Sequence, residues 1–343
     1  MRVLIIGGTG FIGSQTVRTL AASGHHVDVF HRGSTQADLP STVGHIHGDR
    51  ESLASVAAML RCSNPDVVVD MVALTEAHAR ATLNVFGGFA RRLVAVSSFD
   101  VYRAFVVFNR LDGGPLQPVP ITEDGELRTN LFLARDLPNR PADRPPEYEK
   151  ILVERVYRDQ SELGATVLRL PIVYGPGDVR RRRTSRYVTR MMDGRAAILL
   201  DESLSAWTVT RGYVENVGAA IAEAVVNERA VGRTYNLGDV DALTEFQWVT
   251  KLAEAVGWSG RIVLTPRDRV PEGSRFGGNA AQHWVLDTSR IRRELGYQEP
   301  IALDEGLRRT VAWDRANPPE SRPSAMDYQV EDQALAELPS QET

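Results

Sequence analysis

The chain has 343 residues, a formal net charge of −4 at pH 7 and one cysteine, Cys62. This length exceeds one typical domain, the negative charge argues against an overall basic field for nucleic acid, and a single cysteine excludes an intramolecular disulfide. No apolar run approaches the roughly 18 residues of a membrane span, and Met1 leads straight into the first predicted strand without a cationic leader, so we expect a soluble, cytoplasmic protein.

The most informative motif follows the first apolar run, residues 3–6. The segment Gly7-Gly8-Thr9-Gly10-Phe11-Ile12-Gly13 comes next and opens into a helix-period stretch. Gly7 allows a sharp turn off the strand, Gly10 allows backbone amides to approach a pyrophosphate, and Gly13 allows the helix to pack closely on the sheet. An anion then binds at the helix N-terminus. The order of strand, glycine turn and helix predicts a dinucleotide-binding site.

Short β-rich runs alternate with helix-period stretches along the first half of the chain. The expected strands are residues 27–30, 67–69, 93–96 and 166–170, and the expected helices are residues 51–60, 76–90 and 149–163. Such alternation is typical of a parallel sheet covered by helices on both faces. The expected fold class is therefore α/β, with a doubly wound parallel Rossmann sheet.

The rhythm of the sequence changes after Pro171. An arginine-rich segment is followed by a strand candidate at residues 206–210, a helix at about 217–227 and a strand at 233–237. We expect three parts, which are a dinucleotide-binding domain over 1–175, a smaller C-terminal substrate-binding lobe over 176–317 with some segments returning to the first domain, and a flexible tail over 318–343. The long connection between residues 102 and 147, punctuated by proline and glycine, suggests a lid or a substrate loop.

Further motifs follow in order along residues 1–317. They are Gly48-Asp49-Arg50, residues 97–102, residues 120–124, Lys150, and residues 170–177, 211–214, 235–238, 287–296 and 306–313. Together with the glycine motif, they resemble an extended or atypical short-chain dehydrogenase/reductase, the superfamily of nucleotide-sugar epimerases and dehydratases. The resemblance implies a nicotinamide cofactor, a small-molecule substrate such as a sugar or nucleotide sugar that reacts at a hydroxyl or carbonyl, and a homodimer. It leaves the reaction open, because one fold hosts many chemistries.

The resemblance places most cofactor contacts in the first half of the chain. They are Gly7, Thr9, Gly10, Phe11, Ile12, Gly13, His31, Arg32, Asp49, Arg50, Val72, Ala73, Ser97, Lys150, Pro171 and Val173. An NAD-preferring site usually ends its second strand with a carboxylate that binds ribose hydroxyls, whereas this chain has His31 and Arg32 there. No acid would repel a 2′-phosphate, and Arg32 can pair with it bidentately, which favours NADP. NAD remains acceptable if Arg32 stacks on adenine or points to solvent. Asp49 matches a family acid that binds adenine, and it also fits a helix N-cap.

The family chemistry uses a Ser, a Tyr and a Lys, and this chain matches only two of them directly. Ser98 fits the Ser position and Lys150 fits the Lys, but the Tyr position four residues before Lys150 is Pro146. The nearest phenol is Tyr148, and an offset of two residues is about 200° around a regular helix, the opposite face.

Three alternatives follow for the proton donor. Pro145 and Pro146 force extended backbone, so Tyr148 lies in the first helical turn or before it and reaches the nicotinamide. Otherwise Tyr102, Asp100 or a loop residue supplies the proton. In the third alternative the site has no donor, and the chain is a non-catalytic NADP-binding regulatory or RNA-binding protein.

On the substrate side, Arg180, Arg211 and Tyr102 are the candidates. Arg180 begins a run of four arginines, which suits a diphosphate or a carboxylate, a solvated loop, or RNA. Arg211 aligns with a family arginine that contacts a nucleotide-sugar pyrophosphate, and a structural ion pair is its other interpretation. His45 and His47 lie on one side of a possible strand, but with no nearby third ligand we expect no metal site. With one basic run only, nucleic acid is an unfavoured partner.

Overall fold

A computed structural model describes residues 1–35, 37–135, 144–272, 275, 277–319 and 327–338. Its body is one seven-stranded parallel sheet in the order β11-β6-β5-β4-β1-β2-β3. The strands are β1 (Arg2–Ile6), β2 (His26–His31), β3 (Gly44–His47), β4 (Val67–Asp70), β5 (Arg92–Ser98), β6 (Gly164–Leu170) and β11 (Thr234–Asn236). The α/β fold class is confirmed. The strand order reverses beside β1, and open α/β sheets bind ligands at the carboxyl ends of the strands at such a point.

Alternate side chains of the strands enter two separate cores, one on each face of the sheet. Val3 and Ile5 of β1 share a core with residues of α1 (Phe11–Ala22) and α8 (Val214–Val226). Leu4 and Ile6 share the other core with residues of α2 (Ala57–Cys62), α3 (Glu76–Phe86) and α5 (Lys150–Arg158). Because both faces are covered, the strands read as nearly continuous apolar runs.

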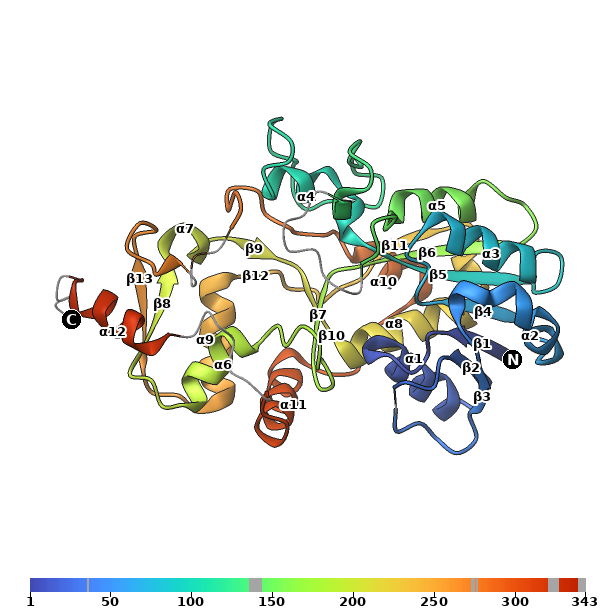
Figure 1. The fold of residues 1–343 in the computed structure, drawn as a ribbon, viewed down its shortest axis with the longest axis horizontal. Helices are drawn as coiled ribbons and strands as arrows, with labels where there is room; N and C mark the ends of the chain where they lie inside the picture. The colour runs from blue at the N-terminus through green and yellow to red at the C-terminus, as the bar shows by residue number, and fades with distance from the viewer. Residues whose placement is uncertain (36, 136–143, 273–274, 276, 320–326, 339–343) are drawn as a thin grey trace.

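A second lobe lies beside the sheet body (Figure 1). It is built from the parallel pair β8 and β13 and the short pair β9 and β12, packed with helices α6, α7, α9 and α11. The bounds are α6 (Ser185–Met192), β8 (Ala197–Asp201), α7 (Glu202–Ser205), β9 (Thr208–Val209), β12 (Leu243–Thr244), α9 (Glu245–Val256), β13 (Arg261–Thr265) and α11 (Leu303–Ala316). The short strands β7 (Ile172–Tyr174) and β10 (Arg211–Tyr213) pair with each other where the chain passes from the body to this lobe.

Segments from the second half of the chain return to the sheet body. Helix α8 packs against α1, and β11 pairs with β6 at the edge of the sheet. Helix α10 (Ser289–Leu295) also belongs to the body side in Figure 1.

Element ends differ from the sequence expectations by a few residues. The helix expected at 51–60 is a 3-10 segment, η1 (Arg50–Val56), followed by α2. Helices α3 and α5 end at Phe86 and Arg158, earlier than expected. Within the described residues, no helix combines the length and the apolar character needed to cross a bilayer.

The expectation of a loose tail is wrong for part of residues 318–343. Helix α12 (Tyr328–Ala336) docks on the lobe, where Glu331 is buried and pairs with Arg190 of α6, with Nε 3.0 Å from Oε1. Asp332 forms a second ion pair with Arg195. Ion pairs hold the helix on the lobe. Its weak apolar periodicity therefore did not predict a packed helix. Residues 320–326 and 339–343 of that predicted tail lie outside the described residues.

Candidate functional site

The glycine turn has the geometry of an anion cradle. Gly7 has φ of +86°, which favours glycine, and its N–H donates to the Phe30 carbonyl at 2.9 Å, joining the turn to the end of β2. A Cβ at Gly13 would lie 2.6 Å from the Gly7 carbonyl oxygen, so only glycine allows this approach of α1 to the turn. Gly10 is the N-cap of α1 and supplies no side-chain cap. The first-turn amides therefore suit a pyrophosphate, and the turn fits a dinucleotide.

Replacing Gly13 with alanine tests this cradle. The added methyl group must displace backbone, so α1 moves off the turn, and we expect the Kd for the dinucleotide to rise at least about tenfold, equivalent to about 1.4 kcal/mol. Isothermal titration calorimetry measures it. Gly113→Ala is the matched control, because a Cβ there meets nothing within 4 Å. Equal affinity of the Gly13→Ala variant and the native chain would contradict the assignment.

Lys150 lies between the carboxyl ends of β4 and β5. It is the first residue of α5, is buried, and its ammonium donates to the carbonyls of Ala73 at 2.7 Å and Val96 at 2.8 Å. Burial lowers the pKa of Lys150 to about 8, against the opposing effects of Asp70 and Asp100. Two of the three ammonium donors are used by these carbonyls, which leaves one for a hydroxyl of the ligand.

Tyr148 stands before α5, not on it. Glu149 is the N-cap, its carboxylate accepting from the Ile151 amide, and the Tyr148 amide donates to the Pro145 carbonyl. The ring is buried, and its hydroxyl donates to Asp100 Oδ2 at 2.8 Å. The structure thus agrees with the alternative in which the two prolines hold Tyr148 ahead of the first turn. A ring on the opposite face of the helix, facing solvent, is not observed.

Ser98 and Asp100 complete this cluster at the carboxyl end of β5. Ser98 Oγ accepts from the Asp100 amide at 3.2 Å, which places the two side chains on one short 3-10 turn, η2 (Phe99–Val101). Asp100 is 2% exposed, yet its Oδ1 has no hydrogen-bond partner among the described residues. The Arg144 guanidinium lies 3.3 Å from Oδ2 and stacks on the Tyr148 ring.

The electrostatics of the cluster keep the phenol protonated. Burial first, and the Asp100 carboxylate second, raise the pKa of Tyr148 well above its usual value. At neutral pH Tyr148 is therefore a hydrogen-bond donor, and Asp100 is the acceptor beside it.

Arg128 binds both to Asp100 of η2 and to Glu149 at the start of α5. Its guanidinium forms a bidentate pair with Glu149, at 2.9 and 2.7 Å, and both side chains are at most 1% exposed. Its Nε donates to the Asp100 carbonyl at 2.7 Å. One buried arginine from the 102–147 connection thus ties η2 to the start of α5. Residues 136–143 of that connection, where we expected a lid or substrate loop, lie outside the described residues.

Tyr102 and Ser97 correct two of our sequence predictions. The Tyr102 hydroxyl donates to Asn236 and accepts from Arg169, and the side chain is fully buried, so its hydroxyl is used within the protein core. Burial raises its pKa to about 12. Ser97 Oγ donates to Glu154 at 2.6 Å in the same buried network, so its side chain does not face the cofactor. Ser98, the next residue along β5, is the serine at the site.

Arg50 was also predicted to contact the cofactor, and that prediction is wrong for its side chain. It forms a bidentate pair with Asp70 at 2.9 and 2.7 Å and also donates to Thr82, inside the sheet–helix core. Asp49 caps η1 by accepting from the Glu51 amide at 3.0 Å, and it remains exposed.

The other predicted cofactor residues lie near the carboxyl edge of the sheet. Val72 and Ala73 follow β4, and Val72 packs over Gly7. His31 ends β2 and the exposed Arg32 follows it. Thr9, Phe11 and Ile12 lie on the turn and at the start of α1, and Pro171 and Val173 lie just past β6. Their contacts with a dinucleotide stay predictions.

The substrate-side arginines have different surroundings. Arg211 is buried, pairs with Glu245 and stacks on Trp248, but its Nη1 has no hydrogen-bond partner in the described part of the chain. Arg180 is exposed on the segment that follows Gly177.

The rest of the arginine run is used within the protein, which weakens its interpretation as an RNA-binding patch. Arg182 donates to the Asn317 carbonyl at 2.8 Å, and Arg183 pairs with Asp178 at 3.1 Å.

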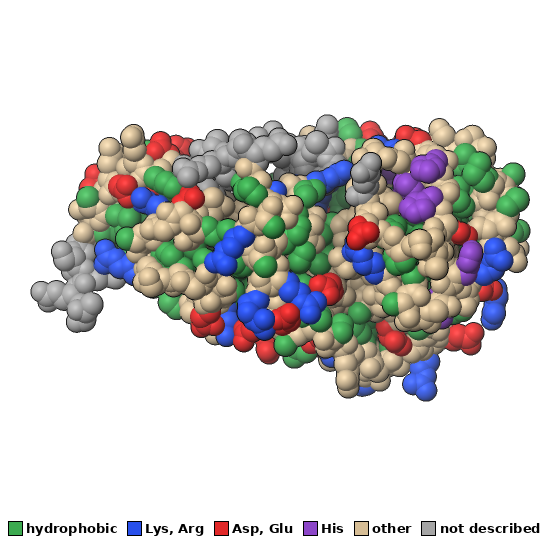
Figure 2. All heavy atoms as spheres, turned by 90° about the horizontal axis from the view of Figure 1, so that it is seen from below, with side chains coloured by type: hydrophobic (Ala, Val, Ile, Leu, Met, Phe, Trp, Pro, Cys, Tyr) green, Lys and Arg blue, Asp and Glu red, His purple; other side chains and the backbone are tan. Residues whose placement is uncertain are grey.

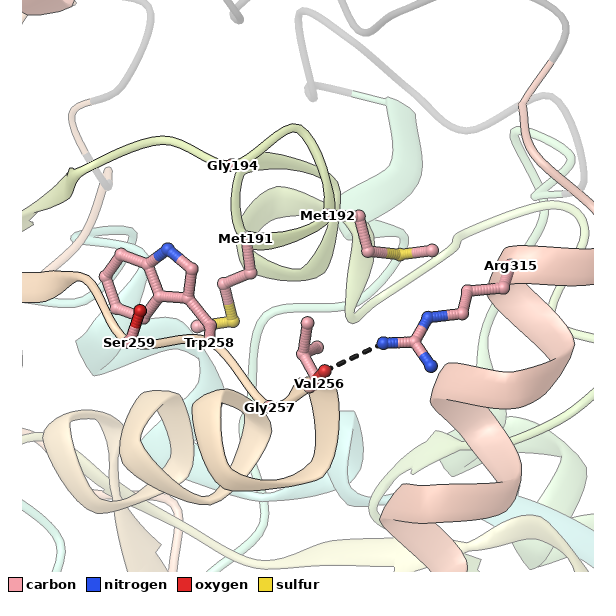
Figure 3. Close-up of a pocket in the computed structure, with 8 residues that line it drawn as sticks. All are labelled: Met191, Met192, Gly194, Val256, Gly257, Trp258, Ser259 and Arg315. Atoms are coloured by element: carbon pink, nitrogen blue, oxygen red, sulfur yellow. Dashed lines mark hydrogen bonds between the residues drawn. The ribbon is translucent and has the colours of Figure 1, made fainter.

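The lobe also contains a hollow of about 370 Å³ (Figure 3). It lies between α6, the end of α9 and α11, and Arg315 donates across it to the Val256 carbonyl at 2.7 Å. Its lining residues are Met191, Met192, Gly194, Val256, Gly257, Trp258, Ser259 and Arg315. None of these elements belongs to the central sheet, so the hollow is separate from the glycine turn and the Ser98 cluster.

Comparison with known proteins agrees with this geometry. Residues 3–96 match the NAD dependent epimerase/dehydratase family. The chain is 28% identical over 335 residues to a dTDP-glucose 4,6-dehydratase of Streptomyces griseus, covering 91% of this chain and 93% of that one. It is 28% identical over 282 residues to a 2′-dehydrokanamycin reductase of Streptomyces kanamyceticus, covering 79% and 71%.

Solved structures of epimerases and dehydratases have a similar fold. A UDP-glucose 4-epimerase of Thermotoga maritima, solved with UDP-glucose, superposes with a TM-score of 0.68 at 20% identity, covering 92% of this chain and 99% of that one. A dTDP-glucose 4,6-dehydratase of Bacillus anthracis, solved with NAD, gives a TM-score of 0.69 at 17% identity, covering 92% and 97%.

The chain is similar to proteins of the extended short-chain dehydrogenase/reductase superfamily, through the family match over residues 3–96 and its dehydratase and reductase relatives. These matches indicate an NAD(P)-dependent enzyme with a small-molecule substrate. The chain departs from the usual Tyr-Lys spacing of that superfamily, because Pro146 stands where the tyrosine is expected. The structure shows another phenol, Tyr148, in the same cluster as Ser98.

Proposed function

We propose that the chain is an NADP-dependent oxidoreductase, epimerase or dehydratase that acts on a hydroxyl or carbonyl of a sugar or a nucleotide-linked sugar. The observation that supports this most is the hydrogen bond from Tyr148 to Asp100 beside Ser98. It supplies a proton donor and an acceptor where Pro146 removes the usual tyrosine. A non-catalytic binding protein would have no need of this buried pair.

The proposed roles follow from the state of each side chain. NADP, when bound, would supply the hydride-transfer chemistry. Ser98 holds the reacting oxygen by its hydroxyl, and Lys150 uses its remaining N–H on the cofactor ribose. When a carbonyl is reduced, Tyr148 gives its proton to the oxygen. When a hydroxyl is oxidised, Oδ1 of Asp100, which has no hydrogen-bond partner among the described residues, accepts the hydroxyl proton.

The preference for NADP rests on the end of β2. His31 and Arg32 stand where an acid would bind the ribose hydroxyls of NAD, and Arg32 is exposed and able to pair with a 2′-phosphate.

Arg32→Ala should therefore weaken NADP binding about tenfold and change NAD binding by less than about twofold, because a charge-assisted contact to the phosphate contributes about 1.5–3 kcal/mol before solvent screening. Calorimetric titration with both cofactors measures this. Arg80→Ala, an exposed arginine on α3, is the control. An equal loss for both cofactors, or tighter NAD binding by the native chain, would refute the NADP preference.

The substrate lobe is proposed to hold the nucleotide part of the substrate. Arg211 has an Nη1 without a hydrogen-bond partner among the described residues, and Arg180 is exposed, so both suit a diphosphate. The homodimer remains a proposal, tested by sedimentation equilibrium.

The substrate is identified by direct conversion. The NADP-loaded protein is incubated with UDP- and dTDP-linked sugars and with small carbonyl compounds plus NADPH, and products are followed by NMR. We expect at least one compound to be epimerised, dehydrated or reduced. Binding of NADP and of panel compounds without any conversion would favour the non-catalytic alternative.

A further inference from the structure

Three histidines from two strands meet at the end of β2. His31 and His47 are register partners in the parallel pair β2–β3, and His45 lies two residues before His47 on the same face. The ring centroids of His31 are 5.1 Å from His45 and 4.6 Å from His47. His45 and His47 are exposed and His31 is partly so; Figure 2 shows histidine side chains gathered together on the molecular surface. The sequence showed two of these imidazoles, and the fold adds the third.

The cluster stands beside the cofactor cradle. The Gly7 amide is bonded to the carbonyl of Phe30, the residue before His31, and Arg32 follows His31 directly. In dinucleotide-binding folds, the adenosine ribose lies over this end of the second strand. The three imidazoles therefore lie at the end of the sheet where such folds hold the adenosine ribose.

We propose that His31, His45 and His47, with Arg32, form a binding site for a phosphate monoester, the 2′-phosphate of NADP, and that this site strengthens as the imidazoles take up protons. The inference rests on the NADP preference proposed above and deepens it. It makes the choice between NADP and NAD depend on pH.

The hydrogen bonds fix which nitrogens carry protons in the neutral cluster. The Gly33 amide donates to His31 Nδ1 at 3.1 Å, so the His31 proton is on Nε2. That Nε2 donates to His45 Nδ1 at 2.9 Å, which leaves the His45 proton on the outward Nε2. A proton added at His45 Nδ1 would face the His31 donor, so it breaks this bond and frees both N–H groups. Protonation thus converts an internal pair into donors for an anion.

The surrounding charges favour coupling between protonation and anion binding. Burial, and then His47 and His45, lower the pKa of His31, since the cations repel one another. A bound dianion removes this penalty. Other charged residues on the adjoining segments are Arg32 after β2, Asp49 after β3, Asp28 of β2, Asp38 in the loop between the two strands, and Arg18 of α1, which donates to the Asp38 carbonyl.

The test is the pH dependence of cofactor affinity, measured by calorimetry with NADP and with NAD, in buffer containing EDTA to remove any histidine-bound metal. For the native chain we expect the NADP Kd to fall about tenfold between pH 8.5 and 6.5, as the imidazole cluster gains protons, while the NAD Kd stays flat. Below about pH 6 the phosphate itself takes up a proton, so the affinity turns down again.

Two variants separate the possible outcomes. His45→Gln/His47→Gln should abolish the rise in NADP affinity toward pH 6.5 and leave NAD binding unchanged, which also shows that the variant is folded. His26→Gln, a histidine at the opposite end of β2, should behave like the native chain. The same pH profile in the native chain and the double variant, with NADP still preferred over NAD, would overturn the histidine site alone. No preference for NADP at any pH would overturn the NADP proposal itself.

Discussion

Tyr148→Phe is expected to lower kcat by about 10²–10⁴-fold while the cofactor Kd changes by less than about twofold. The substitution removes one oxygen atom, the hydroxyl that donates to Asp100 Oδ2 at 2.8 Å. The ring and its packing against Arg144 remain. A loss in kcat without a loss in binding is what the removal of a proton donor produces.

The control is Tyr328→Phe, which removes a phenol hydroxyl from the exposed helix α12. Activity of that variant should equal that of the native chain. If Tyr148→Phe kept full activity on an identified substrate, the donor would have to be another group, and our assignment of Tyr148 would be wrong.

The largest expected effect on stability comes from Arg128→Met. Glu149 is fully buried, and without Arg128 its carboxylate is left as an uncompensated charge, which costs about 3–5 kcal/mol of unfolding free energy. We expect this loss in urea unfolding, followed by circular dichroism and tryptophan fluorescence. Activity should fall as well, because Arg128 also holds the Asp100 carbonyl.

Arg80→Met is the matched control for this variant. Arg80 pairs with Glu76 on the exposed face of α3, and exposed pairs contribute at most about 1 kcal/mol. A loss of less than about 1 kcal/mol for Arg128→Met would mean that Glu149 becomes protonated or solvated at little cost, and that the pair does not hold the site together.

The sheet body could be predicted from the sequence because its signals are local. Apolar runs bounded by turns mark β2, β4, β5 and β6, and the glycine turn fixes the path of the chain after β1. These patterns depend on residues a few positions apart, which one sequence shows directly.

The arrangement of the site depends on contacts between distant segments, which a sequence does not show. Whether Tyr148 lies on or before α5 is decided by the N-cap at Glu149 and by Arg128, which is 21 residues earlier in the chain. The bond from the Ser97 side chain to Glu154 could not be read from the pattern, since both faces of β5 are covered. Helix α12 and the three-histidine cluster were not predicted for the same reason. Ion pairs, and strand register across loops, leave no periodic signal in the sequence.

The most direct test of the central claim, that Ser98, Asp100, Tyr148 and Lys150 surround a site of hydride exchange, is the movement of a deuterium label. A substrate found in the conversion panel is prepared with deuterium on the reacting carbon, or NADPH with deuterium on C4 of the nicotinamide, and products and cofactor are read by mass spectrometry and NMR. We predict that deuterium passes between that carbon and C4 in the native chain, and that transfer slows at least about 100-fold in Tyr148→Phe. Conversion of the substrate with no label ever reaching, or leaving, the nicotinamide would contradict it.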